Sequence, residues 1–298
     1  MKILFIVFTL FLLATKVMAA NVALVIENLP STDSMTLTNA NDTNDQIIEV
    51  LDKYKIPAMG FVNEERIYTD SNIQNRTDIL KKWLSHGYEL GNQSYSNKSY
   101  HMISDKEYFD GIIKGAKVLR KIMSEYNMKP RYFMPPFLHL GTNQRSYNDL
   151  VQFLKREHYI LVPVTILNDD WVFNRAYNKA LEEQDNKTAK NILAQYLEFT
   201  KKRFKFYTEA SIHIFGREVD QIFLIHLNKI NADCLSELIR IPIELGYKYE
   251  NLETVLKDVP YNEKYRAFGR SGYSWLRRCD EMEGRLVDWR HEPQVDGF

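Results

Sequence analysis

Residues 22–28 read Val-Ala-Leu-Val-Ile-Glu-Asn, an unbroken apolar run that ends in a carboxylate and an amide. An apolar run of this length is typical of a strand that is covered on both faces, as in a parallel sheet. Polar residues directly after such a strand lie at the carboxyl edge of the sheet, where folds of this class place their chemistry. We therefore predict that Glu27 and Asn28 belong to a functional site.

Strand-length apolar runs and helical patterns alternate along the rest of the chain. Further strands are predicted at 57–62, 131–134, 159–164 and 222–225, and helical patterns at 47–54, 79–83, 112–123, 192–199 and 235–239. Thr77 is the predicted cap of the second helix, and Ser104 to Glu107 has the form of a capping box. This alternation predicts βαβ units and a parallel sheet, and the number of units favours a closed, barrel-like sheet.

The two ends of the chain differ from this central region. Lys2, the apolar run 3–14 and the small residues Ala19 and Ala20 form the pattern of a secretory signal peptide. We therefore expect a signal peptide at 1–19, a barrel at 20–258, an irregular tail packed on the barrel at 259–298, and export to the periplasm or the medium. The apolar run 3–14 is short for a membrane span, and no later segment supplies one.

The composition excludes some classes of partner. Lys plus Arg and Asp plus Glu both number 39, so no net positive charge points to nucleic acid or acidic lipid. The aromatic content of 13% suits a sugar-binding cleft and a plain core equally. Cys234 and Cys279 could pair in an oxidising compartment, although Cys234 also fits a small buried hydrophobe.

Five polar segments follow the predicted strands: 27–30, 91–97, 134–141, 168–171 and 224–228. In order and content they resemble the five motifs of the polysaccharide deacetylase (NodB-homology, carbohydrate esterase) family, over about residues 22–255. The phrases at 56–63 and 272–278 are also similar to a bacterial branch of that family. The resemblance implies an α/β fold, a deformed (β/α) barrel, and an activity that removes acetyl groups from glycans.

Members of this family use a divalent metal to polarise the acetyl carbonyl and to activate a water. The resemblance puts the general base at Glu27 and the three metal-ligand positions at Asn28, Gln93 and Asn97. It puts the arginine that orients the base at Met134.

The remaining motif positions keep the expected residue types. The resemblance puts the general acid at His226, and the aspartate and tryptophan of the fourth motif at Asp170 and Trp171. Two of them also have a structural interpretation, because His226 could be a core histidine and Trp171 a core aromatic. His139 is predicted to be a loop or surface residue.

The metal positions hold neutral amides, which bind zinc poorly, so we predict no metal and no other cofactor. Neighbouring residues do not restore the site. His101 would give a shifted pair with only one histidine, and Arg131 lies an odd number of residues from Met134, on the opposite face of its strand.

Three hypotheses for the function follow. In the first, Asn28, Gln93 and Asn97, with Tyr95 and Trp171 as aromatic walls, bind an acetylated glycan or peptidoglycan-type polysaccharide without cutting it. The second is a metal-independent carbohydrate deacetylase or hydrolase with the catalytic residues Glu27, Asp170 and His226. The third is an envelope scaffold or partner-binding protein that reuses the barrel, because a fold alone does not specify a function.

Overall fold

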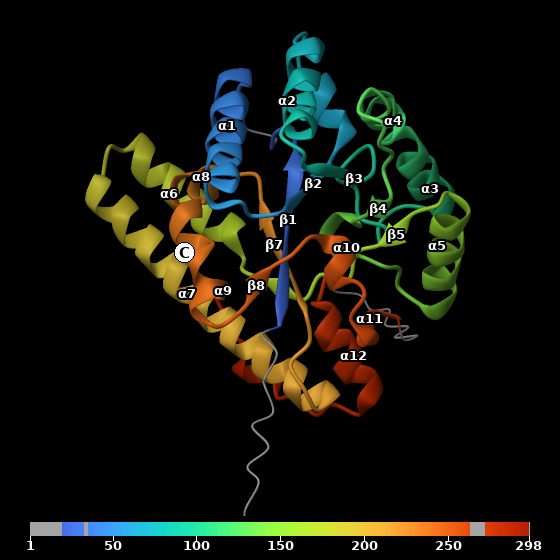
Figure 1. The fold of residues 1–298 in the computed structure, drawn as a ribbon, viewed down its shortest axis with the longest axis vertical. Helices are drawn as coiled ribbons and strands as arrows, with labels where there is room; N and C mark the ends of the chain where they lie inside the picture. The colour runs from blue at the N-terminus through green and yellow to red at the C-terminus, as the bar shows by residue number, and fades with distance from the viewer. Residues whose placement is uncertain (1–19, 33–34, 263–271, 298) are drawn as a thin grey trace, which may run out of the picture.

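The computed structural model describes residues 20–32, 35–262 and 272–297 (Figure 1). Its centre is a parallel sheet with the strand order β5-β4-β3-β2-β1-β7-β6, in which β8 pairs with the start of β1. The strands are β1 (Asn21–Leu29), β2 (Ala58–Val62), β3 (Glu89–Asn92), β4 (Tyr132–Phe133), β5 (Ile160–Leu161), β6 (Ile166–Leu167), β7 (Gln221–His226) and β8 (Lys248–Tyr249).

The sheet curls around an interior of its own. Inward-facing side chains of β1, β4 and β7, among them Val25, Tyr132 and Leu224, pack in a single buried cluster, which a flat sheet would not allow. No ladder joins β5 to β6 among the strands described above, so the barrel stays open along that seam. This curled half-barrel confirms the deformed (β/α) barrel that the sequence predicts.

Helices cover the outer face of the sheet, on both sides of β1 in Figure 1. They are α1 (Leu37–Tyr54), α2 (Ile73–Ser85), α3 (Asp105–Lys114), α4 (Lys117–Ser124), α5 (Gln144–Arg156), α6 (Asp170–Glu182), α7 (Asn186–Phe215), α8 (Lys229–Leu238), α9 (Arg240–Glu244), α10 (Leu252–Val255), α11 (Val259–Asn262) and α12 (Trp275–Glu283), with short 3-10 turns η1 (Glu64–Tyr68), η2 (Pro136–Leu138) and η3 (Trp289–His291). Leu24 and Ile26 of β1 pack outward against this layer while Val25 packs inward, which explains the continuous apolar run.

Some local predictions hold and others do not. The Ser104 hydroxyl accepts from the backbone N–H of Glu107, which confirms the predicted cap. Helix α2 begins at Ile73, so Thr77 lies inside it and donates to the Ile73 carbonyl instead of capping. Residues 275–283 form α12, where the sequence predicted irregular structure; this segment is short and strongly charged, and so carries little apolar periodicity.

Gly115 separates α3 from α4 and supports the loop that carries part of the predicted site. A Cβ atom at this position would lie 2.3 Å from the carbonyl carbon of Ser94 and from the nitrogen of Tyr95. Only glycine therefore allows the helix pair to approach the loop after β3 so closely.

Two predictions concern the compartment. The expected signal peptide lies outside the described residues. None of the described helices is both long enough and apolar enough to cross a membrane.

Cys234 and Cys279 are both buried as thiols and do not form a disulfide with each other.

Candidate functional site

Glu27 and His226 lie side by side at the carboxyl ends of neighbouring strands. They are register partners in the β1–β7 ladder, and both follow inward-facing residues, Val25 and Leu224, at a spacing of two. The His226 Nε2 atom lies 3.3 Å from Glu27 Oε2. The structure therefore brings together the two residues to which the sequence assigned acid and base roles, at the mouth of the half-barrel.

Asp170 holds the imidazole from behind. It is the first residue of α6 and is fully buried. Its Oδ1 atom accepts from His226 Nδ1 at 2.6 Å, and its Oδ2 atom accepts from the backbone N–H of His226 at 2.7 Å. Because Nδ1 is used in this way, Nε2 is the ring nitrogen directed at Glu27.

The charges around His226 shift the pKa values of His226 and Asp170. Burial by itself would lower the pKa of His226, but the carboxylates of Asp170 and Glu27 outweigh it and raise that pKa well above its usual value. Burial would also raise the pKa of Asp170, yet the positive His226 and its hydrogen bonds hold that pKa below its usual value. The two neighbouring carboxylates therefore favour the protonated form of the His226 imidazole.

A chain of buried polar side chains supports Asp170. Asn231 Nδ2 donates to Asp170 Oδ2 and, at 2.8 Å, to the carbonyl of His226. The Tyr196 hydroxyl donates to Asn231 Oδ1 at 2.6 Å and accepts from Asn168 Nδ2 at 2.6 Å. Sequence analysis did not identify Tyr196 and Asn231, because on their own helices they look like an ordinary core aromatic and a residue of a helix start.

Asn28 and Gln93 bind each other. The backbone N–H of Asn28 donates to Gln93 Oε1 at 3.0 Å, and Gln93 Nε2 lies 3.5 Å from Asn28 Oδ1. Asn28 has a φ of 69° at the point where β1 shifts register against β2, a conformation that asparagine tolerates better than most residues. Asn28 and Gln93 thus hydrogen-bond to each other. They stand at two of the positions where the resemblance expects metal ligands.

These residues do not fit a divalent metal. The amides at positions 28, 93 and 97 carry no charge, and Gln93 Oε1 is already an acceptor. Within the described part of the chain, no group of three or more His, Cys, Asp or Glu side chains could hold a metal ion.

The arginine position of the third motif is apolar. The Met134 side chain is fully buried in the barrel interior. Arg131 points away from it and pairs with Glu89, at 2.9 Å from Oε1, and with Glu253, at 2.9 Å from Oε2. The Arg131 guanidinium is thus engaged by two carboxylates, and its side chain is 43% exposed.

The other predicted site residues lie on surrounding loops. Trp171 is 54% exposed on the first turn of α6. Asn97 and Tyr95 are half-buried in the loop after β3, with Lys114 Nζ 3.3 Å from the centre of the Tyr95 ring. One buried oxygen, Glu27 Oε1, has no hydrogen-bond partner among the described residues.

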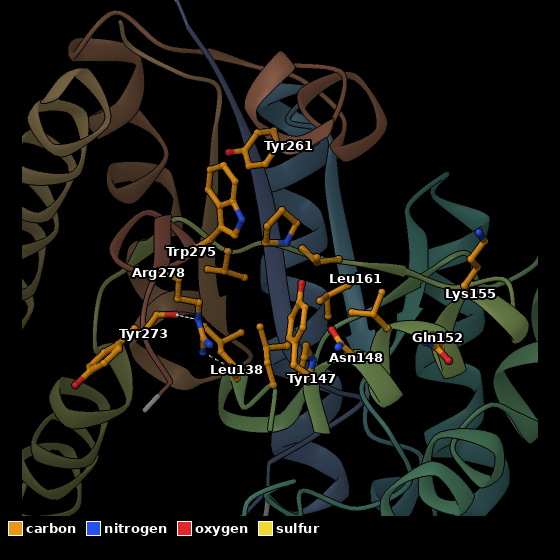
Figure 2. A pocket seen from close by; sticks show the side chains of 16 residues that line it. Leu138, Tyr147, Asn148, Gln152, Lys155, Leu161, Tyr261, Tyr273, Trp275 and Arg278 are labelled. Carbon is orange, nitrogen blue, oxygen red and sulfur yellow. Dashed lines mark hydrogen bonds between the residues drawn. The ribbon is translucent and has the colours of Figure 1, made fainter. Parts of the chain in front are cut away.

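A cavity of about 660 Å³ lies elsewhere, along the open seam of the barrel (Figure 2). Its walls come from α5, from the connection between β5 and β6, and from the C-terminal segment. The backbone N–H of Trp275 in that segment donates to the Val164 carbonyl at 2.8 Å. Figure 2 shows Tyr261 and Trp275 at one end and Gln152 and Lys155 at the other. No residue predicted for the site lines this cavity.

Comparison with known proteins supports the family resemblance. Residues 18–155 match the family model described as polysaccharide deacetylase. A peptidoglycan-N-acetylglucosamine deacetylase of Bacillus cereus is 21% identical over 126 residues, which are 42% of this chain. The match spans 40% of that relative's length.

Solved structures show the same fold. A CE4 family pseudoenzyme from Bacillus anthracis superposes with a TM-score of 0.54 at 18% identity, over 80% of this chain and 66% of that one. A mutant of that pseudoenzyme with restored enzymatic activity has the same TM-score. The chitin deacetylase of the fungal pathogen Colletotrichum lindemuthianum has a TM-score of 0.54 at 18% identity, over 81% of this chain and 89% of that one.

Proposed function

Because this chain belongs to the polysaccharide deacetylase family, we propose that it binds acetylated glycans of the peptidoglycan type without removing their acetyl groups. One observation carries the proposal: His226 Nε2 is paired with Glu27, in a site whose metal-ligand positions hold amides.

Deacetylation needs a base that can take a proton from water and an acid that can give one to the leaving group. It also needs a strong electrophile for the acetyl oxygen. In this site the proton on His226 Nε2 is directed at Glu27, so acid and base neutralise each other. The neutral amides of Asn28 and Gln93 supply no comparable positive charge.

The same site retains features that suit a hydroxyl-rich ligand. Glu27 Oε1 is buried without a partner, and a ligand O–H or amide N–H that donates to it would remove the cost of leaving it unsatisfied. Trp171, the residue after Asp170, presents an exposed ring, and apolar rings with a few polar groups are typical of small-molecule sites. Asn97 and Tyr95 would add a polar and an aromatic wall.

The metal-independent enzyme is the second candidate. The Asp170–His226 hydrogen bond of 2.6 Å favours it, because a carboxylate that orients an imidazole is a common arrangement in general acid–base catalysis. In that case acetate release would persist in a chelator and would be lost in Glu27→Gln and His226→Gln. An envelope scaffold is the third candidate, and it predicts neither glycan binding nor acetate release.

Location and processing are part of the proposal. We propose that the chain is exported after removal of residues 1–19 and acts in the periplasm or outside the cell. The segment pattern Lys2, 3–14 and Ala19 supports this, as does the name of the Bacillus cereus relative. Mass spectrometry of the mature protein from its host tests it, and an intact N-terminus would contradict it.

Calorimetric titration with N-acetylglucosamine oligomers tests the binding itself. We expect saturable binding by the wild type and weaker binding by Glu27→Gln, because the amide nitrogen cannot accept the ligand's hydrogen bond. Equal affinity of the two proteins would show that the ligand does not reach Glu27. No binding by the wild type would favour the scaffold.

A further inference from the structure

Arg203 of α7 lies buried between two carboxylates that are distant in sequence. Its guanidinium donates to Asp169, 34 residues away, and to Glu292, 89 residues away. The Arg203 side chain is only 4% exposed. The Tyr207 hydroxyl, one turn further along α7, donates to the same oxygen of Glu292 at 2.7 Å.

Asp169 is the residue directly before the carboxylate that holds His226. It has φ 49° and ψ 30°, a left-handed conformation that most non-glycine residues avoid and that aspartate tolerates. Its carbonyl accepts from the backbone N–H of Val172 at 3.0 Å, but its side chain does not cap α6. The ion pair with Arg203 is therefore the side-chain contact that holds this turn.

The turn at Asp169 determines where Asp170 points. Asp170 Oδ1 and Oδ2 both contact His226, and a displacement of the turn would move both oxygens together. Asn231 also binds Asp170 Oδ2, but it does so from α8 and cannot hold the backbone of residue 169.

Glu292 reaches Arg203 from a separately anchored segment. Trp289 packs against Phe206 and Tyr207 of α7, with ring centres 5.5 and 6.3 Å apart. Glu292 is 11% exposed and also lies 3.7 Å from Arg277. Without Arg203, the carboxylates of Asp169 and Glu292 would face each other in a partly dry site, which is strongly unfavourable.

We propose that Arg203 is a positioning residue: it fixes the Asp169 turn so that Asp170 orients His226, and Glu292 of the C-terminal segment holds Arg203 in place. Among the described residues, the charged and titratable groups around this arrangement include Asp169 and Asp170 at the start of α6, Tyr207 of α7, Glu292 with Arg277 beside it, and Glu27 facing His226 from β1.

The chain offers a matched control for the loss of an arginine. Arg131 also bridges two carboxylates, Glu89 and Glu253, but it points away from the site. A purely structural role would make Arg203→Met and Arg131→Met differ only in stability. A positioning role makes them differ at His226.

The experiment follows the imidazole Nδ1 proton of His226 by NMR in histidine-labelled protein, assigned by its absence in His226→Gln. We expect a far-downfield resonance in the wild type and in Arg131→Met, and its loss in Arg203→Met. Arg203→Lys keeps the positive charge but loses the planar guanidinium that donates to both carboxylates, so it should retain a weakened signal. The readout needs no ligand, so a wild type that shows the resonance but binds no glycan would sink only the proposed function.

Two outcomes would overturn the proposal. One is an unchanged His226 resonance in folded Arg203→Met, and the other is an equal loss in Arg131→Met. If Arg203→Met does not fold, Asp169→Asn replaces it, because asparagine accepts the left-handed backbone but cannot form the ion pair. The resonance should then be lost in Asp169→Asn, and its full retention would overturn the proposal.

Discussion

His226 Nε2 lies 3.3 Å from Glu27 Oε2, while its other ring nitrogen lies 2.6 Å from Asp170 Oδ1. One imidazole thus lies between two acidic side chains at the mouth of the half-barrel. The polysaccharide deacetylase family implies a metal cation next to the base. Here the ring of His226 lies next to Glu27.

The free energy of unfolding should depend on pH through this cluster. The pKa of His226 is raised in the folded state, so its stabilisation is complete below the unfolded value of about 6.5 and is lost as the pH rises through the folded pKa. The pKa of Asp170 is lowered, so its contribution is present above about 3.9 and is lost as the pH falls through the folded pKa. Denaturant unfolding at a series of pH values measures both the alkaline and the acidic loss of stability.

His226→Gln should abolish the loss of stability at alkaline pH. It should lower the free energy of unfolding by about 3 kcal/mol at neutral pH, because it leaves the carboxyl groups of Asp170 and Glu27 without their cationic partner. His86→Gln is the matched control, since His86 also contacts a carboxylate, Asp52, but at the surface. If the free energy of unfolding of His226→Gln still decreases at alkaline pH as in the wild type, another group causes that dependence.

Metal binding should be restorable at the amide positions. The triple variant Asn28→Asp, Gln93→His and Asn97→His places one carboxylate and two imidazoles where the resemblance expects them, and should bind zinc. Aspartate, like asparagine, tolerates the φ of 69° at position 28. The wild type should bind no stoichiometric zinc, and a chelator should leave its melting temperature unchanged. If the triple variant does not bind zinc, the three positions do not converge.

Activity should need two further changes, Met134→Arg and Glu27→Asp. The triple variant should stay nearly inactive, because a carboxylate misplaced by about 1 Å costs on the order of 10²-fold in rate. The quintuple variant should release some acetate, although an arginine in the apolar interior at position 134 will lower its stability. Acetate release equal to that of the triple variant would contradict the role of position 134 in orienting the base.

Trp171→Ala should weaken glycan binding about tenfold with little change in stability, because the ring is mostly in solvent and its loss removes about 1.4 kcal/mol of contact. Ile243→Ala is the matched control, since Ile243 is 52% exposed on α9. Calorimetry with the same oligomer compares them. Equal affinities of the two variants would place the glycan away from Trp171.

The sequence predicted the parts of the site that follow from strand parity. Glu27 and His226 end apolar runs and continue the inward positions of their strands, and the odd offset of Arg131 placed it on the other face. The sequence could not predict the residues that hold Asp170 and its turn in place. Tyr196, Asn231 and Arg203 act through contacts between segments 34 to 89 residues apart, and their own helices give no local sign of it.

We propose that this site binds an acetylated glycan and leaves it intact. Proton NMR of N-acetylglucosamine oligomers with the purified wild type, in the presence of a chelator, tests both halves in one sample. We predict saturation transfer from the protein to the acetyl methyl protons and no growth of the free acetate signal. A growing acetate signal, or the absence of any transfer to the oligomer, would contradict the account.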